Sequence, residues 1–359
     1  MRAQGTTAAS MDKLLFIRRD NIGDLLCTTP AIRAARLKFK NVKIGVLVNS
    51  YNAEAVSGNP DIDFTHVYTK EKHLPDETRL RVWLKNLKVF KEIRSIKYDA
   101  AIACGSPSAT LARYACITGA RLKIGYAVPG WLSYYNRPVE FSRAGMHEVD
   151  RTFNLLKPLG IEGPPGDMVL VPQDSQRGLF KGFMENSFKD PQRPLVSVLI
   201  SARIKRHRWP VEKYMLLIEG MLNLSNANLV ILWAPGPADS VRFPGDDGLA
   251  GKILKRFEKN SNRVLGYPTP SLSHLIAAMS CAQVTITPDT GSLHVSSALK
   301  KPTVALMTEA NVGVWGPWRT EAAVLRSTGD VSEIEVNPVL SSALAFVERC
   351  ENKGSLYGL

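Results

Sequence analysis

The segment IRRDNIGDLLCTTPAIRA (17–34) contains residues that could transfer a proton. If an apolar strand ends here and a helix follows at once, Asp24 lies at the strand's carboxyl end, where ligands bind in open α/β sheets. A carboxylate there can act as a general base and take a proton from an attacking hydroxyl. Asn21 and Gly23 are expected to contact the molecule that carries this hydroxyl, the acceptor. The structural alternative is a helix cap, because Asp20, Asn21 and Asp24 all favour N-cap positions.

The segment TPDTGSLHVSSALKKPTVAL (287–306) predicts a strand, a tight turn and a helix. Thr290, Gly291 and Ser292 open the helix, where free N–H groups and the helix dipole favour a phosphate. Asp289 can hold sugar hydroxyls just outside the turn, and His294 can donate a hydrogen bond to the same phosphates. These residues are therefore predicted to bind a nucleotide-sugar donor. The structural alternative is an ordinary capped helix with a packed histidine.

A basic loop, SARIKRHRWP (201–210), follows the first predicted strand of the second half of the chain. Its basic residues are Arg203, Lys205, Arg206, His207 and Arg208. Positive charge at the carboxyl end of a strand suits a diphosphate group. A solvated charge run is the alternative, but the position of the loop argues against it.

Several common functional motifs are missing from the sequence. It has no GxxxxGK[ST] loop, no GxSxG elbow and no HExxH helix. No GxGxxG follows the first strand, so NAD binding is not expected. The histidines and acids show no metal-ligand spacing, so no tightly bound metal is expected.

Two alternating series of strands and helices predict the architecture. In the first series, strands are expected at 13–19, 43–48, 66–70, 99–105 and 122–126, with helices at 21–39 and 79–97. In the second, strands are expected at 195–201, 228–234, 283–288 and 303–307, with helices at 211–224, 247–259, 271–279, 291–299 and 338–350. Apolar strands separated by helices indicate parallel sheets covered on both faces. The prediction is an α/β protein with two Rossmann-like, doubly wound domains facing across a ligand cleft.

The composition suggests where these domains begin and end. Residues 1–10 are small and polar and are expected to be a disordered extension, and Met11 is an alternative start. We expect an N-terminal acceptor-binding domain at 11–170 and a Pro- and Gly-rich linker region at 171–194 with a helix at 174–188. A nucleotide-sugar-binding domain follows at 195–335, with a closing helix and tail at 336–359.

Positive charge is concentrated in the first part of the chain. Residues 1–150 carry 23 Lys and Arg against 14 Asp and Glu, and the densest stretch is 79–97. Apolar residues recur there at helical spacing, namely Leu80, Trp83, Leu84, Leu87, Phe90 and Ile93. We predict a helix that packs through these residues and presents a basic face. That face is either simply solvated or attracts a phosphorylated lipid or an acidic membrane surface. Nucleic acid lacks support, because no nucleic-acid-binding motif is present.

The five cysteines form no CxxC pair, and most have apolar neighbours, as in reduced thiols of cytosolic proteins. No segment approaches the ~20 apolar residues of a membrane span. The sequence therefore predicts a cytoplasmic protein.

Taken together, these segments resemble glycosyltransferase family 9, the ADP-heptose:lipopolysaccharide heptosyltransferases, over about residues 13–350. The most specific matches are IRRDNIGDLLCTTPAIRA and PDTGSLHVSSALKKPTVAL, of which the second is close to the family's Asp-Thr-Gly-x-x-His signature. The resemblance implies the GT-B fold and an inverting transfer without a metal or other cofactor. It implies that Asp24 is the base, that Asp289 contacts the donor sugar, and that Thr290, Gly291 and His294 belong to the phosphate-binding turn. Asp239 roughly matches an acid that holds the nucleotide.

The resemblance also implies the partners: a nucleotide-sugar donor, expected to be ADP-heptose, and an anionic acceptor, the lipopolysaccharide core. It implies peripheral contact with the inner face of the inner membrane. One position departs from the family, since His207 stands where a lysine commonly precedes the Trp-Pro pair. Either Lys205, Arg206 or Arg208 supplies that charge, or the donor is different.

Three other functions stay open at this point. The first is a related transferase that uses another nucleotide sugar. The second is a sugar-nucleotide epimerase of GT-B-like fold, which would need no acceptor. The third is a non-catalytic binding protein that keeps the fold. Retention of both Asp24 and the Asp289–His294 turn argues against the third.

Overall fold

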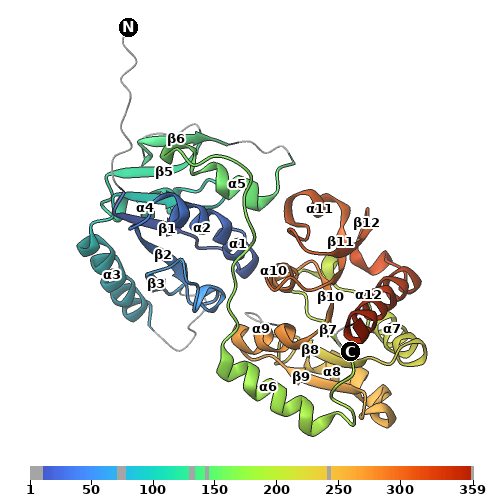
Figure 1. The fold of residues 1–359 in the computed structure, drawn as a ribbon. Coiled ribbons are helices and arrows are strands. Elements are labelled where there is room, and N and C mark those ends of the chain that lie inside the picture. Colours follow the sequence, from blue (N-terminus) through green and yellow to red (C-terminus); the bar gives the residue numbers. More distant parts are fainter. Residues whose placement is uncertain (1–10, 71–77, 129–133, 142–144, 241–243, 357–359) are drawn as a thin grey trace. The chain divides into compact units, whose positions relative to one another are not determined.

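The computed structural model describes residues 11–70, 78–128, 134–141, 145–240 and 244–356. The predicted disorder of residues 1–10 lies outside these ranges. The chain divides into two compact units, Met1–Val169 and Leu170–Leu359, and each has its own sheet with helices around it (Figure 1). Each unit is described by itself below.

Unit 1 contains a six-stranded parallel sheet among its described residues. The strands are β1 (Lys13–Ile17), β2 (Lys43–Asn49), β3 (Phe64–Tyr68), β4 (Ala100–Ala103), β5 (Leu122–Ala127) and β6 (Arg137–Glu140), in the order β3-β2-β1-β4-β5-β6. β1, β2 and β4 are buried almost throughout, because helices cover both faces of the sheet.

The helices of unit 1 are α1 (Ile22–Leu26), α2 (Thr29–Lys38), α3 (Arg79–Ile96), α4 (Ala109–Ile117) and α5 (Glu148–Asn154), with short 3-10 turns at η1 (Ala53–Val56) and η4 (Lys157–Leu159). Part of the core forms where α3 and α4 pack on the sheet through Ile93, Leu111 and Ala115. One prediction for α3 is wrong, since Leu80, Trp83 and Leu84 do not pack and are exposed. The prediction is confirmed for Phe90 and Ile93, which pack on the core together with Val89 and Ile96. Val82 is buried as well.

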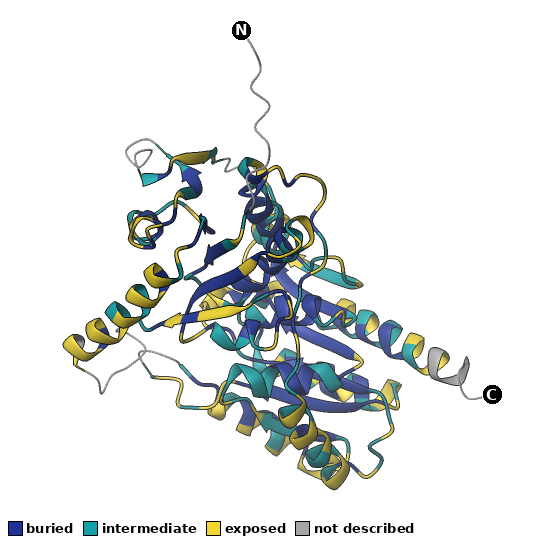
Figure 2. Cartoon of the chain, turned by 60° about the vertical axis from the view of Figure 1, so that its left-hand side comes forward, coloured by how far each residue is buried: buried dark blue, intermediate teal, exposed yellow. Residues whose placement is uncertain are grey.

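Unit 2 contains a second six-stranded parallel sheet in its described part. The strands are β7 (Leu195–Leu199), β8 (Asn228–Trp233), β9 (Val264–Pro268), β10 (Val284–Pro288), β11 (Thr303–Thr308) and β12 (Ala322–Ser327), in the order β12-β11-β10-β7-β8-β9. Figure 2 shows most strand residues as buried, while most exposed positions lie on helices and loops.

The helices of unit 2 are α6 (Asp174–Ser187), α7 (Val211–Leu224), α8 (Asp247–Arg256), α9 (Leu272–Cys281), α10 (Gly291–Ala298), α11 (Glu309–Trp315) and α12 (Val336–Leu356), with 3-10 turns at η5 (Lys205–His207), η6 (Glu258–Asn260) and η7 (Val331–Glu333). α12 packs against α7, and α6 packs against α9. None of the helices in the described ranges combines the length and the hydrophobicity of a membrane span.

Both sheets have the same strand order when each is numbered from its own first strand, and this is the Rossmann order. The direction of winding reverses between β1 and β4 in unit 1 and between β7 and β10 in unit 2. At such a switch point the loops after the two central strands diverge, and ligands bind in the crevice beside the strands' carboxyl ends. The fold therefore identifies the loops after β1 and β10 as the places where each unit binds a ligand. The predicted α/β fold class with two doubly wound parallel sheets is confirmed.

Candidate active site

The loop after β1 places Asp24 at the switch point of unit 1. The Asp24 Oδ1 atom accepts a hydrogen bond from Arg18 Nη2 at 2.5 Å, and Oδ2 accepts from the Asn21 backbone N at 2.9 Å and from Asn21 Nδ2 at 3.0 Å. A carboxylate has about four acceptor positions. Within the described part of the chain, these donors fill three of them and leave one on Oδ1. Asn21 is the N-cap of α1 and Asp24 is the N3 acid of the capping box, so the structural alternative is correct for this turn. One acceptor position of Asp24 still has no donor among the described residues.

Arg18 belongs to a buried line of four alternating charges. Its Nη1 atom donates to Glu148 Oε1 at 2.8 Å, and the other oxygen of Glu148 accepts from Arg151 Nη1 at 2.7 Å. The order of the line is therefore Arg151, Glu148, Arg18, Asp24. All four residues are less than a tenth exposed, so each charge depends on its neighbours for compensation. The line connects the end of β1 to the first turn of α5 and so fixes the orientation of the Asp24 carboxylate.

The two acids of this loop have opposite pKa shifts. Burial raises the pKa of Asp24, but the Arg18 charge and the hydrogen bonds from Asn21 outweigh it, so this pKa lies below its usual range. Burial dominates at Asp20 and raises its pKa, with the Asp24 charge adding to the shift and Arg18 opposing it. Asp20 Oδ2 lies 3.5 Å from Arg18 Nε and would be 2.8 Å from a Cβ at Gly105, whose φ is +129°. Glycine at 105 therefore leaves the space that Asp20 fills.

The two predicted acceptor-binding residues differ in exposure. Asn21 is the N-cap of α1 and is exposed, whereas Gly23 is buried inside this short helix. Asn21 can therefore reach an acceptor with its side chain. Gly23 has no side chain with which to contact an acceptor, and it lies in the helix directly before Asp24.

The turn between β10 and α10 lies at the switch point of unit 2. Thr290 is the N-cap of α10, and no side chain caps the first turn of this helix. The hydroxyl of Ser292 instead bonds to Thr290 Oγ1 at 2.7 Å and to Thr287 Oγ1 at 2.6 Å. These bonds hold the shape of the turn and leave its N–H groups for an anion. His294 is buried, with its ring edge-to-face against Trp315 at a centroid distance of 5.9 Å.

Asp289 is held by one residue of α11 and one of the 3-10 turn η5. Asn311 Nδ2 donates to Asp289 Oδ2 at 2.6 Å, and His207 Nδ1 lies 2.8 Å from the Asp289 carbonyl oxygen. Since a carbonyl oxygen only accepts, His207 donates through Nδ1. His207 is 4% exposed, and its ring supports the backbone of the turn.

The basic loop after β7 separates into exposed and engaged cations. Arg203, Lys205 and Arg206 are exposed. Arg208 is engaged, since its Nε donates to the Ala202 carbonyl oxygen at 2.7 Å and its Nη1 donates to Asp246 Oδ1 at 3.0 Å. The exposed three are therefore the better candidates for a diphosphate.

The predicted nucleotide-binding acid, Asp239, is exposed in the loop after β8. Within the described ranges, no hydrogen bond or ion pair joins its side chain to the other predicted residues. The acid of this loop that does contact one of them is Asp246, which is buried beside Arg208. The next residue, Asp247, accepts from Trp233 Nε1 at 2.7 Å and from the Gly236 backbone N at 2.9 Å and so fixes the loop.

Comparison with known proteins places the chain in a family. The model of glycosyltransferase family 9 (heptosyltransferase) matches residues 86–337, which is well over half of the chain. The chain belongs to glycosyltransferase family 9. It is therefore a glycosyltransferase. The matched residues include the β10–α10 turn and the basic loop after β7, but they do not include Asp24.

Relatives of this family 9 member match along nearly its whole length. Lipopolysaccharide heptosyltransferase 1 of Escherichia coli O18:K1:H7 (strain RS218 / NMEC) is 24% identical over 362 residues, covering 96% of this chain and 99% of the relative. The solved structure of a family 9 glycosyl transferase from Veillonella parvula DSM 2008 superposes with a TM-score of 0.81 at 19% identity, covering 95% and 99% of the two chains. The structure of E. coli ADP-heptose lps heptosyltransferase II gives 0.75 at 17% identity, with 94% and 99% covered. These two structures confirm the GT-B fold.

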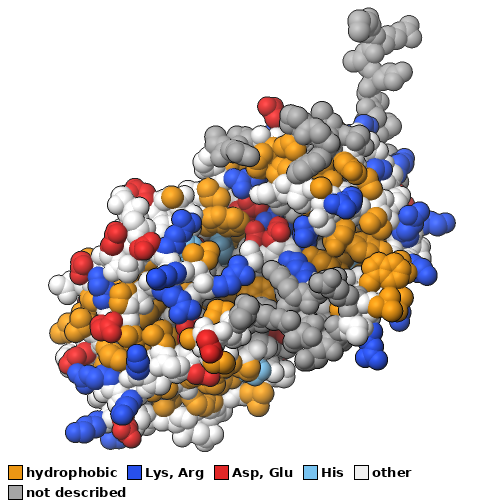
Figure 3. All heavy atoms as spheres, turned by 180° about the vertical axis from the view of Figure 1, so that it is seen from behind, with side chains coloured by type: hydrophobic (Ala, Val, Ile, Leu, Met, Phe, Trp, Pro, Cys, Tyr) orange, Lys and Arg blue, Asp and Glu red, His pale blue; other side chains and the backbone are white. Residues whose placement is uncertain are grey.

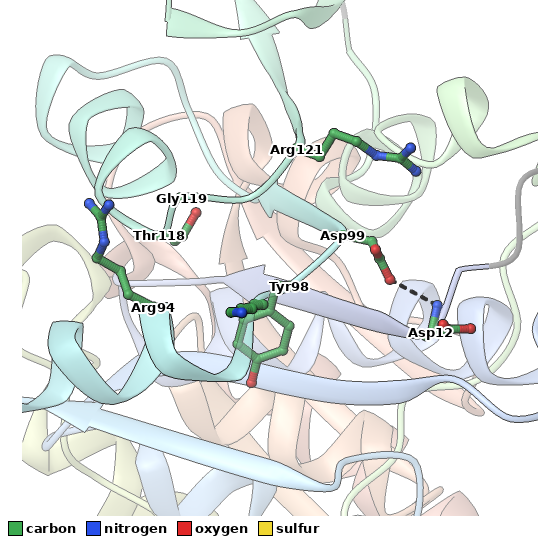
Figure 4. A pocket seen from close by; sticks show the side chains of 8 residues that line it. Asp12, Arg94, Tyr98, Asp99, Thr118, Gly119 and Arg121 are labelled. Atoms are coloured by element: carbon green, nitrogen blue, oxygen red, sulfur yellow. Dashed lines mark hydrogen bonds between the residues drawn. The ribbon is translucent and has the colours of Figure 1, made fainter.

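A pocket of about 630 Å³ in unit 1 lies away from these loops. It is lined by Asp12, Asp99 and Arg121, among others, beside the amino ends of β1, β4 and β5. Figure 4 shows the side chains of Arg94 and Arg121 pointing away from each other, so they do not converge on one anion. Asp99 Oδ2 accepts from the backbone N of Asp12 and is part of the local structure. We therefore do not assign the active site to this pocket. In the parts of the chain that the structure describes, no three His, Cys, Asp or Glu residues form a metal-binding group.

Sequence reasoning missed four residues that hold the candidate site together: Glu148, Arg151, Asp246 and Asn311. Asn311 follows β11 and Asp246 lies in the loop after β8, so both occupy carboxyl ends of strands. A search of every strand end for polar residues would have found these two. No sequence signal connects Glu148 to Arg18, because 130 residues separate them.

Proposed function

We propose that this family 9 glycosyltransferase transfers a heptose from ADP-heptose to the lipopolysaccharide inner core or to a related surface glycan. The observation that carries the proposal is the Asp24 carboxylate, which is kept ionised and oriented at a switch point with one acceptor position open. The donor is suggested by the name of the E. coli ADP-heptose lps heptosyltransferase II, and the acceptor by the lipopolysaccharide heptosyltransferase relative.

In the proposed reaction, an acceptor hydroxyl donates its hydrogen bond to Asp24 Oδ1. The hydroxyl oxygen attacks the anomeric carbon of the donor, and the bond from that carbon to the diphosphate oxygen breaks as the new bond forms. The proton passes to Asp24, and ADP leaves with both bonding electrons. One displacement of this kind inverts the anomeric centre.

The second unit supplies the charge that the leaving diphosphate needs. The N–H groups at the start of α10 and the exposed cations Arg203, Lys205 and Arg206 would stabilise the developing negative charge, which is often the largest catalytic contribution. Asp289, positioned by His207 and Asn311, would bind the donor sugar. Because these groups are part of the protein, we propose that the reaction needs no metal and no other cofactor.

We further propose that the enzyme acts on the cytoplasmic side, in peripheral contact with the inner membrane that carries its acceptor. The excess of Lys and Arg in residues 1–150 favours an anionic glycolipid and an acidic membrane surface.

A thermal-shift panel of ADP, ADP-heptose, UDP and GDP on the purified protein tests the donor. Selective stabilisation by ADP and ADP-heptose is expected. A preference for UDP or GDP would exclude the heptose donor and leave the transferase class in place. Product analysis without an acceptor separates an epimerase, which converts the donor alone, from a transferase. Activity in the presence of EDTA tests the absence of a metal requirement.

A further inference from the structure

Helix α3 presents an apolar surface that folding does not use. The side chains of Leu80, Trp83 and Leu84 are 64%, 58% and 51% exposed. Their spacing of three and four residues places them side by side on the first turns of the helix. The same helix packs on the core of unit 1 through Val89, Phe90 and Ile93, so it is anchored without them. Figure 2 shows α3 exposed along most of its length.

The remainder of this outward face is positively charged. Arg81, Lys88, Lys91 and Arg94 are exposed along the helix. The one acid of α3, Glu92, is directed to β3, where its Oε1 atom lies 3.1 Å from His66 Nδ1. Figure 3 shows hydrophobic side chains next to Lys and Arg side chains over α3. The face therefore combines an apolar end with a cationic end.

This combination matches the chemistry of an anionic bilayer surface. Tryptophan and leucine enter the boundary between headgroups and acyl chains, and lysine and arginine remain at the level of the phosphates. A helix of 18 residues is about 27 Å long, so it can lie flat on a membrane with both ends in contact. Nucleic acid would use the cations but would leave the three apolar side chains in water.

We infer that the outward face of α3 docks this enzyme on an anionic phospholipid bilayer, with Leu80, Trp83 and Leu84 inserted and Lys88, Lys91 and Arg94 on lipid phosphates. The inference gives the proposed membrane contact a specific surface. It does not depend on which donor or acceptor the enzyme uses. Lipid binding is measured without either substrate, so it can fail or succeed separately from the proposed reaction.

The test is co-sedimentation of the full chain with phosphatidylcholine vesicles that contain about one third phosphatidylglycerol, and with pure phosphatidylcholine vesicles. The apolar variant is Leu80→Ser/Trp83→Ser/Leu84→Ser. Its matched control is Leu179→Ser/Leu216→Ser/Leu224→Ser, whose side chains are exposed on unit 2 to a similar extent. The charge variant is Lys88→Gln/Lys91→Gln, with Lys252→Gln/Lys259→Gln on unit 2 as its control. All five control positions, three leucines and two lysines of unit 2, lie away from the candidate site loops, and circular dichroism checks the folding of each variant.

We expect the unaltered protein to sediment with the anionic vesicles and the apolar variant to lose at least about tenfold in partitioning. The charge variant should lose several-fold, and both controls should bind as the unaltered protein does. Brominated lipids should quench part of the tryptophan fluorescence, and Trp83→Phe should abolish that part.

Three results would overturn the inference. The unaltered protein could fail to sediment with anionic vesicles, or it could bind uncharged vesicles equally well. The α3 variants and their controls could also lose vesicle binding to the same extent. If the apolar variant instead converts a dimer into a monomer in sedimentation velocity and leaves vesicle binding unchanged, the face contacts a second copy of the chain and not a membrane.

Discussion

The loops after β1 and after β10 lie at equivalent switch points of two sheets with the same strand order. They differ in the number of charged side chains that they contain and in how these side chains are paired. The first loop contains ionised side chains that are buried and paired. Asp24 and Arg18 form an ion pair at 2.5 Å, and Glu148 continues the line from another part of the unit. Every charge in this line is fixed by its neighbours before any substrate binds.

The second loop has few charges of its own. Asp289 is held by the neutral amide of Asn311 and by the ring of His207, and the turn that follows consists of small residues around an uncapped helix start. The loop after β7, the strand beside β10, holds exposed cations such as Arg203 and Lys205. These two loops are suited to receive a charge that a ligand brings.

The difference fits a division of labour in glycosyl transfer. A base must be ionised and aimed at one hydroxyl, which a buried ion-pair line provides. A leaving diphosphate needs positive potential that is already in place, which open N–H groups and exposed cations provide. The same fold can supply both, because the switch point determines where a site lies and not what it contains.

The largest effect should come from breaking the ion-pair line of unit 1. Glu148→Ala leaves Arg18 and Arg151 without their shared buried partner, which should lower the free energy of unfolding by about 3–5 kcal/mol. Asp150→Ala, in the same first turn of α5, is the control and should cost no more than about 1 kcal/mol. Urea titration measures both. If both variants lose the same small amount of unfolding free energy, the ion-pair line does not stabilise the loop after β1.

A smaller effect is expected in unit 2. Asn311→Ala removes the amide that Asp289 accepts from and leaves a carboxylate oxygen without its partner, which should cost about 1–3 kcal/mol. If Asp289 binds the donor sugar, ADP-heptose affinity should fall roughly tenfold or more, and ADP affinity should fall less. Calorimetric titration gives both constants. Asn136→Ala, which removes an Asn amide from unit 1, is the control. If Asn136→Ala lowers the affinity for ADP-heptose as much as Asn311→Ala does, Asp289 does not bind the donor sugar.

The smallest effect should be a change of stability with pH. The pKa of Asp24 is lowered in the folded protein, so its stabilisation is fully present above the unfolded value of about 3.9 and is lost as the pH falls through the folded value. The difference in unfolding free energy between the unaltered protein and Asp24→Asn should therefore be constant near neutral pH and shrink below about pH 4. Urea titrations at several pH values measure it. A difference that grows on acidification would contradict the shift.

The comparison also shows what the sequence could predict. Both loops stood out because each motif is local, with a strand, a turn and a helix inside about 20 residues. Their partner Glu148 did not stand out, because its contact with Arg18 joins residues that are 130 positions apart. Asn311 lies just after β11, where a search of strand ends for polar residues would have found it. The central strands were predicted from continuous apolar runs. β6, β9 and β12 were missed because their burial is mixed, which leaves no such run. The fourth edge strand, β3, was predicted.

Helix α3 shows a different limit. Its spacing predicted the helix correctly but joined residues of two faces into one packing surface. Of the predicted residues, Phe90 and Ile93 do pack, whereas Leu80, Trp83 and Leu84 lie on the other side and are exposed. Periodicity alone does not choose between two apolar faces, since the choice depends on the shape of the sheet surface that the helix covers.

The most direct test of the account is the single-turnover rate of Asp24→Asn, measured with saturating donor and acceptor and together with its affinity for ADP. Asp20→Asn, in the same loop, is the comparison. The account predicts that Asp24→Asn lowers the rate by roughly a hundredfold to ten-thousandfold, with ADP affinity nearly unchanged and a smaller loss for Asp20→Asn. Near-normal turnover by a folded Asp24→Asn protein would contradict the assignment of the base and with it the proposed role of the unit 1 loop.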